Sequence, residues 1–240
     1  MNLNTKQRAF NKAMTQYHDN KNYQKIYKLV SILNVGMQMY LFILLFTFSI
    51  EWYIFFLILF ISYFITDFVN GYVHMYMDNN DRYDSMVGPF IASFHLHHRT
   101  PEYKNFSIVR IYFNESGPKF WLVPFLILTV ILSLFSVSEY ILLTLILVGI
   151  LSSVAEVSHF LCHNSNSKVV LFLQKMNLLL SMKHHDNHHE KDNQSYAFLN
   201  GMSDFLLDRI ASKLYRGYKE NSDLHANGYV GVGTDNRDKL

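Results

Sequence analysis

The chain has 240 residues, with 21 Lys and Arg against 19 Asp and Glu, so its formal net charge is only +2. The basic residues are scattered singly rather than gathered in a stripe, and no nucleic-acid partner is expected. A single cysteine excludes both an intrachain disulfide and a thiolate zinc cluster. Half of the residues are hydrophobic and 17% are charged, against about 25% charged in soluble domains.

Two long apolar blocks account for this composition. Residues 29–77 carry only Glu51 and Asp67 as charges, and residues 120–167 carry only two acids as well. A bilayer core of about 30 Å needs about 20 apolar residues in a helix, so each block is long enough for two spans. The sequence therefore predicts an all-α integral membrane protein with four transmembrane helices in two hairpins, at about 29–50, 53–74, 120–138 and 140–163.

The basic residues predict the orientation. Six of them lie in residues 1–28, five in 75–119 and ten in 164–240, which places all 21 opposite the hairpin tips at Glu51 and Glu139. By the positive-inside rule both termini are cytoplasmic. No cleavable signal peptide is expected, and the membrane would be the endoplasmic reticulum in a eukaryote or the inner membrane in a bacterium. The predicted domains are a cytoplasmic segment (1–28), a membrane-embedded domain (29–210) and a loose polar tail (211–240).

Histidine is the unusual residue. Ten of the 12 histidines fall between positions 74 and 189. A helical rise of 1.5 Å per residue places His74 about 31 Å from Tyr53, and His159 about 29 Å from Tyr140, so both lie at the cytoplasmic boundary. The apolar stretch 169–182 is too short and too polar to span and is predicted to be interfacial or re-entrant. Such segments would bring the remaining histidines to the same depth.

A single histidine near a helix end often only faces the interface, but four separate segments that converge at one depth favour a metal site. Asp67 and Glu156 lie on the helix faces that carry histidines. Each is expected to accept the second ring N–H of a metal-bound histidine. His18 and His225, in polar terminal segments, are expected to be solvated, and the role of His95 stays open.

The number of donors indicates the metal. A closed zinc site takes four ligands, whereas nine or ten candidates converge here. Two six-coordinate ions would use that number, and imidazole with carboxylate suits iron as well as zinc or copper. A dinuclear iron site fits best, and it would activate O2 to remove hydrogen from an unactivated acyl or alkyl carbon.

Four motifs resemble those of the lipid desaturase domain family, which contains plasmanylethanolamine desaturase (Kua) and the plant palmitate desaturase of phosphatidylglycerol. The matching segments run in order from about residue 60 to residue 210. They are Asp67-x3-Gly71-x2-His74-x3-Asp78, Phe94-x2-His97-His98-x2-Pro101, His159-x3-His163, and His184-His185-x2-His188-His189 with the trailing Tyr196 and Gly201.

This resemblance implies a di-iron desaturase that acts on a membrane lipid with O2 as co-substrate and cytochrome b5 or ferredoxin as electron donor. His184 is the weaker ligand candidate, because the plant branch of the family lacks it. Met75, Cys162 and Met202 stand where the family commonly has other residues, mostly Trp, which affects the expected acyl channel. The ligands that the resemblance implies are His74, Asp78, His97, His98, His159, His163, His185, His188 and His189.

Two alternatives remain at this stage. A membrane di-iron lipid hydroxylase would use similar histidine motifs but insert oxygen. A non-enzymatic metal- or lipid-binding membrane protein belongs to a different class. The depth of the ligands favours a double bond near the head group of an intact lipid, with a plasmanylethanolamine-type ether lipid ahead of an acyl phospholipid.

Overall fold

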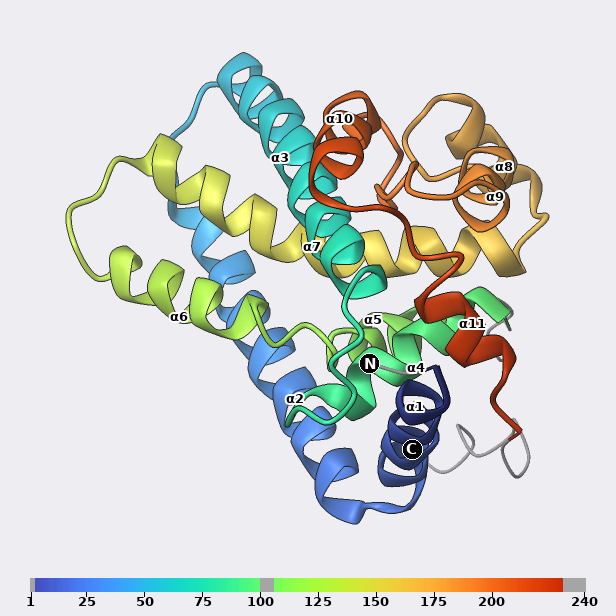
Figure 1. Ribbon diagram of the computed structural model, residues 1–240. Helices are drawn as coiled ribbons and strands as arrows, with labels where there is room; N and C mark the ends of the chain where they lie inside the picture. Colours follow the sequence, from blue (N-terminus) through green and yellow to red (C-terminus); the bar gives the residue numbers. More distant parts are fainter. Residues whose placement is uncertain (1–2, 100–105, 231–240) are drawn as a thin grey trace.

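The computed structural model describes residues 3–99 and 106–230, and over these ranges the chain is helical and contains no strand (Figure 1). Three helical segments are long and apolar enough to cross a membrane. They are α2 (Lys21–Leu44) with the short 3-10 helix η1 (Leu45–Thr47), α3 (Trp52–Asp78), and α7 (Glu139–Asn164). The prediction of an all-α protein with long apolar helices is confirmed.

Helices α3 and α7 pack against each other through the middle of the molecule (Figure 1). Small polar side chains lie buried between them, and the Asn70 amide donates to the Ser152 hydroxyl at 3.1 Å. Small residues let two helix backbones approach closely, and buried polar groups need such partners away from water. This pair of helices sets the positions of the histidines at their carboxyl ends.

The predicted span at 120–138 contains a shorter helix. Helix α6 (Leu122–Ser133) has 12 residues, or about 18 Å at 1.5 Å per residue. Pro124 stands in its first turn, where a missing N–H costs nothing. The preceding loop is held inside the protein, since the Asn34 amide donates to the carbonyls of Ser116 and Lys119 at 2.9 and 3.2 Å. Four spans in two hairpins are therefore not confirmed.

Both terminal segments contribute packed helices. Helix α1 (Leu3–Asp19), α4 (Gly88–Arg99) and α11 (Ser222–Asn227) pack together at one end of the molecule (Figure 1). Their shared core includes Phe10, Met14, Tyr83, Ile91 and Ala226. The expected loose tail is corrected over residues 211–230, where four of the six α11 residues are buried; residues 231–240 lie outside the described ranges.

The remaining four helices are short, and three of them start at a serine cap. They are α5 (Ile108–Glu115), α8 (Lys168–Lys175), α9 (Met182–Glu190) and α10 (Asp204–Leu214). The side chains of Ser107, Ser167 and Ser181 each accept a backbone N–H in the first turn that follows. The predicted interfacial segment 169–182 contains most of α8 and ends where α9 begins, so it supplies a short helix rather than a span.

Candidate metal centre

Four helices, α3, α4, α7 and α9, bring the nine predicted ligands together in two adjoining groups. Each group contains four side chains whose possible ligand atoms all lie within 4.8 Å of one another. The acid-containing group consists of His74, Asp78, His98 and His188. The all-histidine group consists of His97, His163, His185 and His189, together with His159, which contacts three of them.

The spacing of the motifs explains this division. The i,i+4 pair at the end of α3 serves only the acid-containing group, and the i,i+4 pair of α7 serves only the all-histidine group. Helix α4 contributes to both, because the adjacent His97 and His98 point about 100° apart around the helix. Helix α9 likewise divides its histidines, with His188 in one group and His185 in the other.

The acid-containing group is built around a buried carboxylate. Asp78 is fully buried, and its oxygens lie 3.3 Å from ring nitrogens of His74, His98 and His188. Those contacts lack hydrogen-bond geometry, so neither carboxylate oxygen has a hydrogen-bond partner among the described residues. A buried carboxylate without hydrogen bonds is costly, and a cation between its oxygens and the three rings would compensate for them. The donor set therefore fits a metal ion.

The outer ring nitrogens of this group are all held. His74 Nδ1 lies 2.7 Å from the carbonyl of Tyr196, and His188 Nδ1 lies 3.0 Å from that of Gln194. His98 Nδ1 lies 2.7 Å from Oδ1 of Asp223 on α11. When Nδ1 donates to such an acceptor, the Nε2 lone pair is left for a metal. No motif in the sequence pointed to Asp223.

The all-histidine group contains a close cluster of ring nitrogens. His159 Nε2 lies 2.9 Å from Nε2 of His185, 3.1 Å from that of His97 and 3.3 Å from that of His163. His189 Nε2 lies 3.0 Å from His185 Nε2. Lone pairs gathered this closely repel one another unless they share protons or a cation. Five imidazoles around one point suit iron, zinc or copper.

Electrostatics favours the neutral, metal-binding form of two of these rings, His97 and His185. Burial, and then the neighbouring histidines, lower the pKa of His97 and of His185 well below the ordinary histidine value. Both rings are therefore neutral at pH 7, which is the form that ligates metals. Burial also acts to lower the pKa of His98, but the carboxylates of Asp78 and Asp223 outweigh it and raise that pKa to about 9. Without a metal, His98 is therefore protonated at pH 7, and a metal ion that binds its Nε2 would displace that proton.

The two carboxylates predicted to hold histidine rings have other partners. Asp67 accepts the backbone N–H groups of Leu199, Asn200 and Ser203 at 2.9–3.1 Å. Glu156 pairs with the buried Lys119 ammonium at 2.9 Å. Asp67 lies seven residues, or about 10 Å of helical rise, from His74, too far for a direct hydrogen bond. Its effect on His74 is indirect, because it anchors the loop that carries the Tyr196 carbonyl.

Gly71 lets that loop reach α3. A Cβ at this position would lie 2.9 Å from the Cα of Ala197 and would collide with the Leu207 side chain. The face of α3 that carries Asp67, Gly71 and His74 therefore packs against the loop that follows α9. At the end of this face, His74 Nδ1 contacts the Tyr196 carbonyl of the loop directly.

Four further histidines lie outside both groups. His184 contacts Asp204 at 2.6 Å, and His95 uses both ring nitrogens, toward Tyr83 and the Met77 carbonyl, at 2.9 and 2.8 Å. His225 is not solvated as expected, since it is buried with its Nδ1 3.1 Å from the Tyr83 hydroxyl. His18 lines a cavity. Pro101 of the second motif lies outside the described residues.

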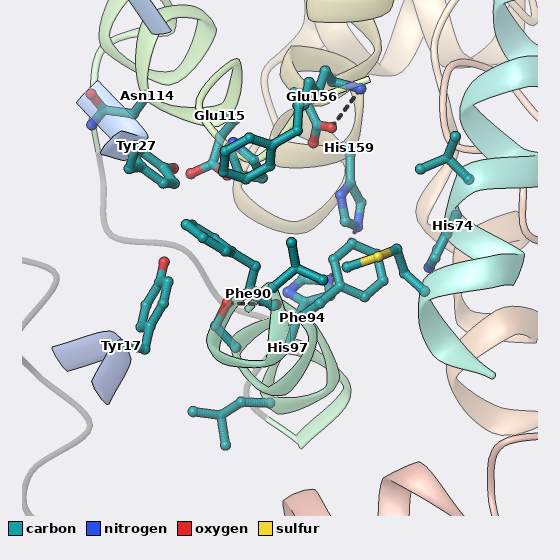
Figure 2. Close-up of a pocket in the computed structure, with 18 of the residues that line it drawn as sticks. Tyr17, Tyr27, His74, Phe90, Phe94, His97, Asn114, Glu115, Glu156 and His159 are labelled. Carbon is teal, nitrogen blue, oxygen red and sulfur yellow. Dashed lines mark hydrogen bonds and ion pairs between the residues drawn. The ribbon is translucent and has the colours of Figure 1, made fainter. Parts of the chain in front are cut away.

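An apolar cavity of about 420 Å³ adjoins the candidate metal centre, and its size is within the range of small-molecule sites. Figure 2 shows His74, His97 and His159 on one side of it and Tyr17 and Tyr27 on the other. Phe90 and Phe94 lie between these ends (Figure 2). Met75, Cys162 and Met202 are not among the described residues that line this cavity. The three departures from the family pattern thus lie away from the described cavity wall.

The fold and the site define a membrane protein with a histidine-rich candidate metal centre beside an apolar cavity. The family model described as "Lipid desaturase domain" matches residues 63–219. The chain belongs to this family, as its four motifs indicated. Neither the curated proteins nor the solved structures include a match to the chain.

Proposed function

We propose that this chain is an O2-dependent di-iron desaturase, which introduces a double bond near the head group of a membrane lipid chain. One observation carries the proposal. In a member of the lipid desaturase family, two adjoining groups of metal-ligand side chains form the wall of an apolar cavity through His74, His97 and His159.

Each group would hold one iron ion. Once bound, the two ions would supply O2 activation and hydrogen removal from the lipid chain. The overall reaction balances when one CH2–CH2 unit, O2, two electrons and two protons give one CH=CH unit and two molecules of water. We propose cytochrome b5 or ferredoxin as the source of the two electrons.

The chain's own residues would bind and orient the lipid. Aromatic side chains, among them Phe90, Phe94 and Phe198, line the cavity and would exclude water from the lipid chain. The rings that reach the cavity wall come from α3, α4 and α7, so the reacting carbons would lie where these helices meet. A main contribution of a protein to such chemistry is to hold the lipid chain in a fixed position against the reactive centre.

The proposed topology retains four spans with both termini in the cytoplasm, and α6 with its flanking residues forms the third span. The ligands would then lie at the cytoplasmic interface, where the ester or ether linkage of a phospholipid and its first carbons also lie. This depth favours an intact phospholipid as substrate, with an alkyl-ether lipid ahead of an acyl one. Labelling sites placed beside Glu51 and Glu139 should report the side away from the cytoplasm; cytoplasmic reporting at Glu139 would contradict the topology.

Lipid analysis tests the reaction itself. Expression in plasmalogen-deficient cells should restore acid-labile vinyl ethers in O2 but not without it, and the His188→Ala variant should restore none. A new acyl double bond without a vinyl ether would make the lipid class wrong and keep the desaturase. A hydroxylated lipid as sole product would identify a hydroxylase. If the protein binds metal but forms no lipid product, it is a non-enzymatic metal- or lipid-binding protein.

A further inference from the structure

The short helix α11 places a carboxylate against the metal centre from outside the matched family domain. Asp223 Oδ1 lies 2.7 Å from His98 Nδ1, and the side chains of His98 and Asp223 are only 3% and 8% exposed. The two residues are 125 positions apart in the chain. The family match covers residues 63–219, so His98 lies inside the matched region and Asp223 lies beyond it.

This contact orients the His98 ring. With Nδ1 directed at Asp223, the opposite nitrogen, Nε2, lies 3.3 Å from Asp78 Oδ1 and 3.2 Å from His188 Nε2. A carboxylate that accepts the Nδ1–H bond fixes the tautomer and makes Nε2 a more basic ligand. The other two rings of the acid-containing group meet backbone carbonyls instead. Of the three, His98 alone has a charged acceptor, which gives the stronger hydrogen bond.

We propose that Asp223 is a positioning residue of the metal centre, and that α11 is therefore part of the functional unit. The inference rests on the proposed metal-dependent function. It assigns to Asp223 the orientation of His98 and a second negative charge beside the acid-containing group, in addition to that of Asp78.

Several contacts fix α11 in the position that this role requires. The Ser222 hydroxyl donates to the backbone carbonyl of Asp78 at 2.6 Å, which ties α11 directly to the end of α3. Lys219 Nζ lies 3.2 Å from the second oxygen of Asp223. The Tyr83 hydroxyl lies 3.1 Å from Nδ1 of His225, two residues further along α11. Asp223 is thus held from the turn just before α11, from α3 and from the loop before α4.

The test compares two nearly isosteric variants of the full-length protein. Asp223→Asn keeps an acceptor oxygen but removes the charge beside His98. Tyr83→Phe removes a different polar contact of α11, the one with His225, and leaves Asp223 in place, so it serves as the matched control. Fe(II) retention is measured by chelator competition, and the absorption spectrum of the Co(II)-loaded protein reports ligand geometry independently of activity.

We expect wild type to retain two ions and Asp223→Asn to hold one of them roughly tenfold to a hundredfold more weakly, with a changed Co(II) spectrum. Asp223→Glu should recover part of the loss, and Tyr83→Phe should resemble wild type. Unchanged retention and spectrum in Asp223→Asn would overturn the inference alone. An equal loss in Tyr83→Phe would also overturn it, since helix packing would then explain both. A wild-type chain that binds no divalent metal would overturn the proposed function as well.

Discussion

The two halves of the candidate metal centre share helices α4 and α9 but differ in how their ligands are held. In the acid-containing group, the outer nitrogens of His74, His98 and His188 each meet an acceptor, and Asp78 adds a negative charge. In the all-histidine group, the Nδ1 atoms of His185 and His189 are buried without a hydrogen-bond partner among the described residues. Surrounding acceptors orient the three rings of the acid-containing group, whereas His185 and His189 contact other rings of their own group through Nε2.

This difference predicts unequal metal affinity. An anionic ligand and prearranged rings reduce the reorganisation needed to bind a cation, and the partners behind the ligands typically contribute tenfold to a hundredfold in affinity. The acid-containing group should therefore bind the tighter ion, and the all-histidine group the more labile one. The predictions below test the two groups in order of expected effect.

The largest effect is expected for His185→Ala, which removes a central ring of the all-histidine group. Activity should fall below detection and at least one iron should be lost, because His185 Nε2 contacts two other rings of that group. Desaturation assays and metal analysis of the purified protein measure both. The neighbouring His184→Ala is the matched control, since His184 faces Asp204 outside both groups. Equal inactivation by the two substitutions would contradict the assignment.

Gly71→Ala should weaken the acid-containing group through the loop behind it. The added methyl would collide with Leu207 and Ala197, and overpacking of this kind costs about 1–3 kcal/mol. We expect a lower melting temperature together with weaker binding of the tighter ion. Gly36→Ala is the control, because nothing lies within 4 Å of the added Cβ there. A stable Gly71→Ala protein with unchanged metal binding would show that the loop contact is dispensable.

A smaller effect is the order of metal loss in the wild-type protein. Stepwise chelation of the wild-type protein should remove one ion about tenfold more readily than the other. In the His189→Ala variant, the more labile ion should no longer bind, whereas the tighter ion should be retained. Chelator titration followed by metal analysis measures the two steps. Simultaneous loss of both ions in wild type would contradict the inequality between the groups.

The sequence predicted which side chains converge better than it predicted how they are arranged. The i,i+4 pairs of α3 and α7 follow from helical periodicity, and the short helices α4 and α9 follow from apolar stretches that end in histidines. The division into two groups was not predictable, because it depends on the rotation of α4 that sends His97 and His98 to different groups. Glu156 was expected to accept a histidine N–H, but it pairs with the Lys119 ammonium instead. A buried carboxylate is better compensated by a positively charged partner.

Long-range contacts account for the other differences. Asp67 lies on the predicted face of α3, but its partners are backbone N–H groups more than 130 residues away. Asp223 and His225 stand in a polar segment without hydrophobic periodicity, so composition indicated a tail. Only the packing of α11 against α4 and α1 brings them inside the protein.

The metal content of the purified full-length protein tests the central claim most directly. Elemental analysis combined with Mössbauer spectroscopy of protein grown with ⁵⁷Fe should find about two irons per chain, in two distinct environments that correspond to the two ligand groups. A single equivalent of zinc, or a protein free of metal that still forms the lipid product, would contradict the account.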